Sequence, residues 1–106
     1  MIKIEIKETS NIDDVIVHGH ANYSESGTDI VCASVSTLVI STVNAILRFD
    51  HDAISYEEND GFINIKNIKK DNITNELLNN MISLFEELVT KYPKNIQLKR
   101  GNLWNF

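Results

Sequence analysis

Residues 30–47 most constrain the fold of this chain, because eighteen consecutive positions carry no charge. A helix of that length can cross a bilayer. Polar side chains, however, recur at helical spacing along this stretch and just after it, and on a helix they form one stripe. The stripe consists of Ser34, Thr37, Ser41, Asn44 and Arg48. Because such a stripe is typical of the outward face of a core helix, we expect a soluble domain rather than a membrane span.

The chain has room for one domain, which we assign to residues 1–106. A single cysteine excludes an intrachain disulfide and a cysteine-rich zinc module. The first residues alternate apolar and charged side chains, whereas a signal peptide needs a continuous apolar stretch, so we expect a cytoplasmic protein. The net charge of −5 argues against a dedicated nucleic-acid binder and favours a neutral or basic partner.

The apolar spacing alternates between the period of a strand and that of a helix. We expect strands at residues 2–7, 15–19, 53–57, 62–67 and 96–99, with turns at residues 11–14 and 59–61. The first helix is expected to begin at a Thr28 or Asp29 cap and to run to about Arg48. The second is expected to begin at Asp71 and to end before Pro93, since proline cannot continue a helix.

The resulting order, β-β-α-β-β-α-β, predicts an α+β fold. In this fold a mixed, mainly antiparallel sheet carries two helices packed on one face. The other face of the sheet must then be covered or polar.

Cys32 is expected to lie in the first turn of the first helix. The positive end of the helix dipole favours a thiolate, which is the nucleophilic form of cysteine. Donors at a helix start can also hold the negative oxygen of a tetrahedral intermediate. A buried core cysteine is the alternative that position alone leaves open.

Three other side chains are candidates for a site around this thiol. His20 follows the second predicted strand and can take the thiol proton. Asp29 either orients the imidazole or only caps the helix, and Ser36, one turn after Cys32, either supports the thiolate or packs against the sheet. A metal site made of His18, His20 and Cys32 is a further alternative, but no dense ligand spacing supports it, so we expect neither a metal nor a cofactor.

The two segments that hold these residues resemble a known family, the ribosomal-processing cysteine protease family called Prp. Gly19-His20-Ala21 fits its G-H-A motif, and residues 29–33 fit the start of its D-[IV]-[VI]-C-A-A-[VI]-S motif. Ser34 stands where the family usually has the second alanine. The predicted order of strands and helices also looks like that family over nearly the whole chain.

The resemblance implies that Cys32 is the nucleophile and His20 its partner. Members of the family remove a short N-terminal extension from a large-subunit ribosomal protein (number twenty-seven of the L series) around the time of ribosome assembly, and they usually form homodimers. Gly19, Ala21 and Gly27 would belong to a substrate loop, of which residues 21–28 close over the peptide. The implied partner is therefore a ribosomal protein precursor, with no direct contact to nucleic acid or membrane.

Two functions of other classes stay open from the sequence. One is a peptide-binding or ribosome-associated assembly module of the same fold that does not cleave. The other is a small structural dimer in which Cys32 is buried.

Overall fold

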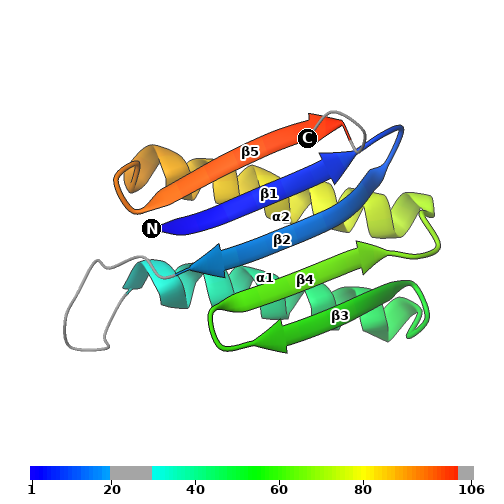
Figure 1. The fold of residues 1–106 in the computed structure, drawn as a ribbon. Coiled ribbons are helices and arrows are strands. Elements are labelled where there is room, and N and C mark those ends of the chain that lie inside the picture. The colour runs from blue at the N-terminus through cyan, green and yellow to red at the C-terminus, as the bar shows by residue number, and fades with distance from the viewer. Residues whose placement is uncertain (20–29, 103–106) are drawn as a thin grey trace.

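A computed structural model describes residues 1–19 and 30–102 of the chain. Its elements are β1 (Ile2–Glu8), β2 (Ile12–Gly19), α1 (Ile30–Phe49), β3 (Ile54–Asn59), β4 (Phe62–Asn67), α2 (Asn72–Lys91) and β5 (Ile96–Asn102). The predicted order β-β-α-β-β-α-β is confirmed. Figure 1 shows this order along the ribbon, with both helices running behind the sheet.

The strands form one five-stranded sheet in the order β3-β4-β2-β1-β5. Every neighbouring pair is antiparallel except β1 and β5, which are parallel. The parallel pair is possible because α2 carries the chain across the sheet before β5 begins. The sheet is thus mixed and mainly antiparallel, as predicted. The second hairpin, β3 and β4, lies on the β2 side of the first hairpin, and β5 lies on the β1 side.

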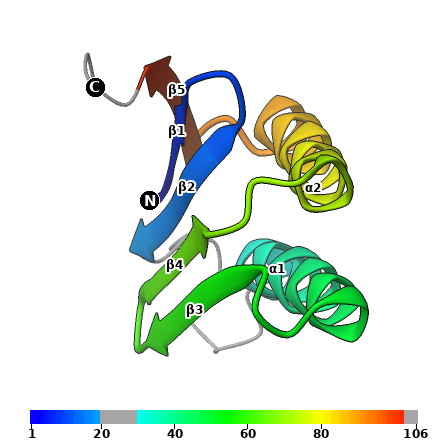
Figure 2. The same cartoon turned by 90° about the vertical axis from the view of Figure 1, so that its right-hand side faces the viewer.

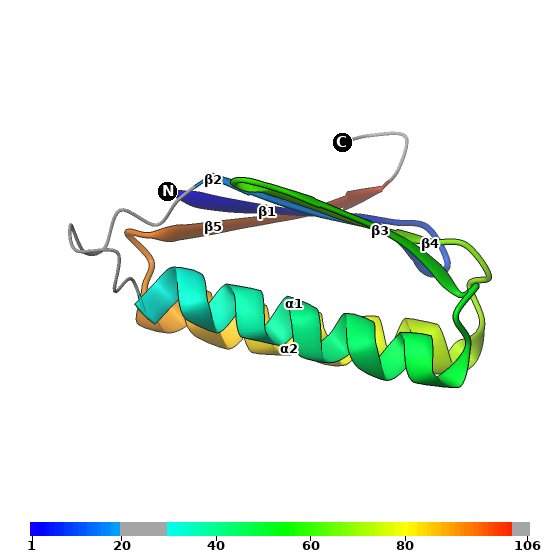
Figure 3. The same ribbon diagram turned by 90° about the horizontal axis from the view of Figure 1, so that it is seen from below.

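Both helices pack on one face of the sheet, so the domain has two layers (Figure 3). Viewed along the strands, the sheet twists, and both helices lie to its right, with α1 beside β4 and β3 and α2 above α1 (Figure 2). The core between the layers is formed by alternate strand residues and by one stripe of each helix. Its largest fully buried side chains include Ile4, Ile6, Ile65, Leu78, Met81 and Phe85.

The first helix is, by length and composition, apolar enough to cross a membrane. Its buried side chains are those that face the sheet, namely Val31, Val35, Val39, Val43 and Ile46. The predicted polar stripe lies on the other side, with Ser34 half-buried and the following members exposed: Thr37, Ser41, Asn44 and Arg48. In this structure, α1 is therefore a core helix that packs beside α2 on one face of the sheet, as the polar stripe predicted.

The second strand begins earlier than the sequence indicates, because Ile12 and its neighbours belong to β2 rather than to a turn at residues 11–14. The backbone of Ile12 is held by two distant side chains. Its N–H donates to Asn75 Oδ1 at 2.7 Å, and its carbonyl accepts from Asn67 Nδ2 at 2.8 Å. Ile12 itself is 3% exposed. Contacts far along the chain thus extend the strand where local turn residues predicted a bend.

A buried carboxylate ties the start of β2 to the segment that precedes α2. Asp13 is 7% exposed, accepts from Thr9 Oγ1 at 2.8 Å and lies 2.9 Å from Nζ of Lys70. Lys70 has a positive φ of 56°, and its N–H donates to Asn67 Oδ1 at 3.0 Å. Burial raises the pKa of the Asp13 carboxyl, but hydrogen bonds from Lys70 and Thr9 outweigh it and hold the pKa below its ordinary value.

Removing this charge is expected to destabilise the domain. Asp13→Asn should lower the free energy of unfolding at pH 7 by about 1–3 kcal/mol, because Lys70 loses its buried partner. Since the folded state lowers the pKa of Asp13, the contribution of the charged form is complete above the ordinary value of 3.8 and is lost as the pH falls below it. Urea unfolding should therefore show a smaller difference between wild type and Asp13→Asn at pH 3 than at pH 7.

The exposed Asp52, whose side chain is 70% accessible, provides the matched control. Asp52→Asn should change stability at pH 7 by less than about 0.5 kcal/mol. An equal loss of stability in both variants would show that Asp13 contributes only net charge.

Candidate active site

Cys32 is the third residue of α1 and lies in its first turn, where the sequence predicts it. The first turn of α1 lies near the end of β2, since Cys32 and Gly19 border the same cavity. Val31, the residue before Cys32, is fully buried. Cys32 is half-buried, packing partly against the core. Cys32 consequently lies at the edge of the core rather than inside it, which argues against the buried-cysteine alternative.

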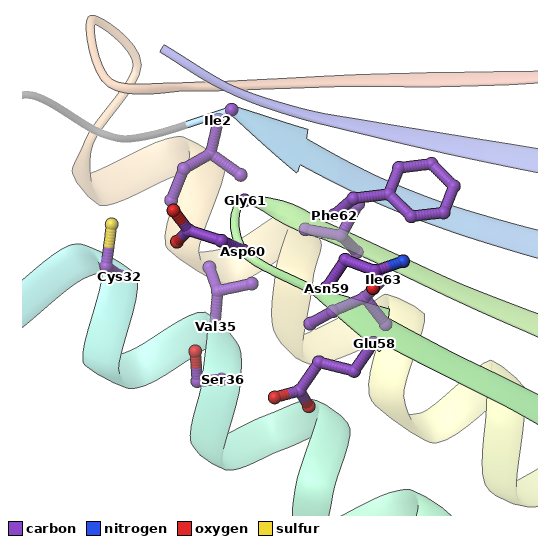
Figure 4. A pocket seen from close by; sticks show the side chains of 12 residues that line it. Ile2, Cys32, Val35, Ser36, Glu58, Asn59, Asp60, Gly61, Phe62 and Ile63 are labelled. Atoms are coloured by element: carbon purple, nitrogen blue, oxygen red, sulfur yellow. The ribbon is translucent and has the colours of Figure 1, made fainter.

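The thiol borders a cavity of about 440 Å³. It is bordered by the start of α1, the start of β1, the end of β2 and the hairpin of β3 and β4. Figure 4 shows Cys32, Val35 and Ser36 on one side, with the β3–β4 turn facing them. The apolar wall is formed by Ile2, Val17, Val35 and Ile63, and the remaining lining by Gly19, Cys32, Ser36, Glu58, Asn59, Asp60, Gly61 and Phe62. A volume of this size lies within the range of ligand pockets.

Gly19 fixes the end of β2 at this cavity. It has a φ of 92°, a conformation that side chains disfavour. A Cβ placed on it would lie 2.4 Å from the carbonyl oxygen of Met1. Its N–H donates to the carbonyl of Gly61 at 2.9 Å, which links the end of β2 to the β3–β4 turn. Gly19 is thus the last residue of a strand and part of the wall, rather than part of a loop.

Replacing this glycine is expected to disturb both the fold and the cavity. Gly19→Ala should lower the free energy of unfolding by about 1–3 kcal/mol, since alanine is strained at a positive φ and its Cβ meets a backbone oxygen. Thermal unfolding measures the loss. Gly101→Ala in β5 is the control, because φ at Gly101 is not positive. A Gly19→Ala variant as stable as Gly101→Ala would contradict the close approach to Met1.

The structure brings Ser36 and Cys32 to the same cavity, one helical turn apart. Ser36 is exposed, so it is available to a bound molecule rather than packed against the sheet. The remaining predicted site residues, His20, Ala21, Gly27 and Asp29, lie outside the residues that the structure describes. Their roles stay predictions.

His18 lies on the opposite face of the sheet from Cys32. It pairs across the sheet with Lys3 and Phe62, and its Nε2 is 4.0 Å from Glu5 Oε1 on the outward face. Val17, next to it, points into the core. The alternative metal site that combined His18 with Cys32 is therefore wrong, because the alternation of the strand separates the two side chains.

His51 lies in an exposed turn, as its sequence neighbours suggest, with a side chain that is 86% accessible. Asp50, His51 and Asp52 form a group whose ligand atoms lie within 4.8 Å of one another. Asp50, however, already binds Lys69, whose Nζ is 2.5 Å from Asp50 Oδ2. The hydrogen bond from Lys69 lowers the pKa of Asp50. The group is therefore explained as a solvated turn with an ion pair.

Sequence reasoning missed the β3–β4 turn as part of this site. Glu58, Asn59 and Asp60 line the cavity, although they stand more than twenty-five positions after Cys32 in the chain. The turn itself was predicted from Asn59-Asp60-Gly61, and Gly61 takes the positive φ of 71° that such a turn needs. The missing information was the strand order, because only the pairing of β4 with β2 brings the turn to the start of α1.

A cysteine at a helix start beside a cavity can perform nucleophilic acyl transfer. The dipole of α1 is positive at this end and favours both a thiolate and a negative oxygen formed next to it. The open cavity gives a bound chain access to the sulfur. These are the requirements for covalent attack on a carbonyl group.

Comparison with known proteins agrees with this chemistry. The family described as Cysteine protease Prp matches residues 1–97 of the chain. The ribosomal processing cysteine protease Prp of Staphylococcus aureus is 33% identical over 100 residues, covering 92% of this chain and 94% of the relative. The protein of the same name from Bacillus subtilis is 52% identical over 29 residues, covering 27% of this chain and 26% of the relative.

Solved structures show the same fold. The crystal structure of Prp from S. aureus with a covalently linked product peptide matches with a TM-score of 0.89 at 29% identity, covering 95% of this chain and 100% of that one. The structure of the same protease with a substrate peptide matches with a TM-score of 0.84 at 28% identity and the same coverage. A protein from Streptococcus mutans matches with a TM-score of 0.80 at 28% identity, covering 96% of this chain and 95% of that one.

Proposed function

We propose a substrate and a mechanism for this chain, which belongs to the cysteine protease Prp family and is therefore a cysteine protease acting in ribosomal processing. The proposed substrate is the precursor of a large-subunit ribosomal protein, number twenty-seven of the L series, from which the enzyme removes the N-terminal extension. One observation carries the proposal: Cys32, the single cysteine of the chain, borders an open cavity at a helix start. In the S. aureus relative, a product peptide is covalently linked to the protease.

The reaction starts with attack of the Cys32 sulfur on the scissile carbonyl carbon. A C–S bond forms, and the carbonyl electron pair moves to oxygen, which faces the positive end of α1. Collapse of this intermediate breaks the C–N bond and releases the amine product with a proton. Water then attacks the thioester, frees the carboxyl product and restores the thiol.

We assign the proton transfers to His20. This residue follows Gly19 directly in the sequence, and Gly19 lines the same cavity as Cys32. An imidazole here can take the thiol proton before attack and return it to the leaving amine. Asp29 is proposed to orient the imidazole or to cap α1, and Ser36 to support the thiolate from the next turn.

The structure and the family weigh against the two alternatives. A structural dimer with a buried Cys32 does not fit a half-buried thiol on a cavity wall. Membership of a cysteine protease family favours a cleaving enzyme over an assembly module that only binds a peptide. A product peptide, rather than a stable complex, distinguishes the two experimentally.

We also propose that the enzyme works as a homodimer in the cytoplasm. Apolar side chains are exposed on α1, with Ile30 50% and Ile40 47% accessible. Such side chains are available for burial against a second copy of the chain. A lone cysteine suits a reducing compartment. Sedimentation equilibrium should give twice the chain mass of 12.1 kDa, and a value near 12.1 kDa at micromolar concentration would contradict the dimer.

Incubation with the extended ribosomal protein tests the proposed substrate. The products are read by mass spectrometry, and we expect two fragments separated at one peptide bond near the N-terminus. The mature protein without its extension is the matched control and should stay intact. Cleavage of the control at the same rate, or no cleavage of the precursor, would overturn the proposed substrate.

A further inference from the structure

We infer that Glu58 and Asp60 form a specificity subsite that selects a lysine or arginine side chain of the peptide substrate. Both carboxylates line the cavity that holds Cys32. The inference rests on the proposed function, because it assumes that a peptide occupies this cavity during cleavage. It adds a determinant on the β3–β4 hairpin, a part of the chain outside the motifs that carry the resemblance.

The position of the two carboxylates follows from the hairpin. Glu58 shares the helix-facing side of β3 with Tyr56, whose partner Ile65 is fully buried. Asp60 lies at the turn itself. Figure 4 shows the Glu58 side chain extending from β3 toward α1, and the Asp60 carboxylate on the side of the turn that faces Cys32. Two negative groups from one hairpin therefore face the space next to the thiol.

Tyr56 holds Glu58 in this orientation. Its hydroxyl donates a hydrogen bond to Glu58 Oε2. Burial, with the hydrogen bond to Glu58, raises the pKa of Tyr56 to about 12, so the hydroxyl keeps its proton at neutral pH. A carboxylate that is held in place by a donor loses less side-chain freedom when it binds a cation. Its other oxygen can still accept a hydrogen bond.

The rest of the lining selects the chemical class of the ligand. Among the described residues around the cavity, the charged side chains are these two carboxylates, and no basic side chain neutralises them there. Beside them lies the apolar wall of Ile2, Val17, Val35 and Ile63. A lysine or arginine side chain matches this combination, because its methylene stem packs on apolar surface while its charged end reaches a carboxylate.

A peptide series spanning the scissile bond tests the subsite. Each position in turn carries lysine, norleucine or glutamate, and kcat/KM is measured for wild type, Glu58→Gln and Glu57→Gln. Glu57 is the matched control, since it lies next to Glu58 on the opposite face of β3 and pairs with Asn64. Both variants lose one negative charge, so a difference between them reports local contact rather than the overall field.

At one position, we expect wild type and Glu57→Gln to prefer lysine over norleucine by about tenfold. In Glu58→Gln this preference should fall to less than about threefold, and in the double variant Glu58→Gln with Asp60→Asn to about one. Glu57→Gln should cleave the norleucine peptides at the wild-type rate, since Glu57 lies on the opposite face of β3 from the cavity. Equal lysine preference in wild type and Glu58→Gln would overturn the subsite while leaving the protease function standing. If wild type cleaves none of the peptides and not the precursor, the proposed function fails instead.

Discussion

Cys32→Ala is expected to abolish cleavage of the ribosomal precursor, with a loss in kcat of about 10⁴-fold or more. The physical reason is the loss of the atom that forms the covalent bond, since no other cysteine exists in the chain. Binding should be retained, because Cys32 is one of twelve described residues that line the cavity. The measurement is product formation by mass spectrometry, together with the affinity of the uncleaved precursor for the variant.

Two controls separate chemistry from folding. The change removes one heavy atom from a half-buried side chain. The free energy of unfolding should therefore change by less than about 1 kcal/mol, and the thermal midpoint should shift little. Ser36→Ala, in the same cavity one turn later, should lower kcat far less, by about tenfold, if it supports the thiolate through one hydrogen bond. A folded Cys32→Ala variant that cleaves as well as wild type would overturn the nucleophile assignment.

The elements of the fold were predictable because their signals are local. Alternating Ile2, Ile4 and Ile6 indicate one buried strand face, and all three are at most 2% exposed. Asp71 marks the start of α2, where its Oδ1 accepts from the N–H of Thr74 at 2.8 Å. Such signals depend on residues within one turn or one pleat of each other, so a single sequence is enough to find them.

The arrangement of these elements was less accessible. The sequence predicts two hairpins but not their order in the sheet, and the pairing of β2 with β4 depends on residues about fifty positions apart. The turn at residues 11–14 was mispredicted for the same reason, since Asn67 and Asn75 hold the backbone of Ile12. Long-range contacts of this type leave no periodic trace in the segment that they shape.

The residues of the candidate site likewise differ in whether local sequence signals or long-range contacts determine their position. The position of Cys32 in the first turn of α1 was predictable from helix periodicity and is confirmed. The acidic groups opposite it were not, because Glu58 and Asp60 approach the thiol only through the strand order. The alternation of β2 did predict that His18 points away from Val17, and His18 is not among the described residues that line the cavity.

His20→Ala is the second variant with a large expected effect, a loss in kcat of about 10²–10⁴-fold near neutral pH. Without a base, the thiol must lose its proton to water before it attacks, and the leaving amine must find a proton elsewhere. His18→Ala is the matched control, because it removes an imidazole two positions away on the outward face, where the side chain is 38% accessible. The control should keep the wild-type rate. Equal losses in the two variants would indicate a structural effect on β2 rather than lost catalysis.

Alkylation of Cys32 by iodoacetamide separates the two roles of the histidine. If His20 takes the thiol proton, His20→Ala should alkylate more slowly than wild type near neutral pH, since the thiolate is the reacting form. The two rates should converge at alkaline pH, where hydroxide removes the proton in either protein, and His18→Ala should follow wild type throughout. A His20→Ala variant that alkylates like wild type at every pH, yet cleaves slowly, would assign His20 to protonation of the leaving amine alone. In that case the positive end of the α1 dipole, rather than an imidazole, is the main source of thiolate stabilisation.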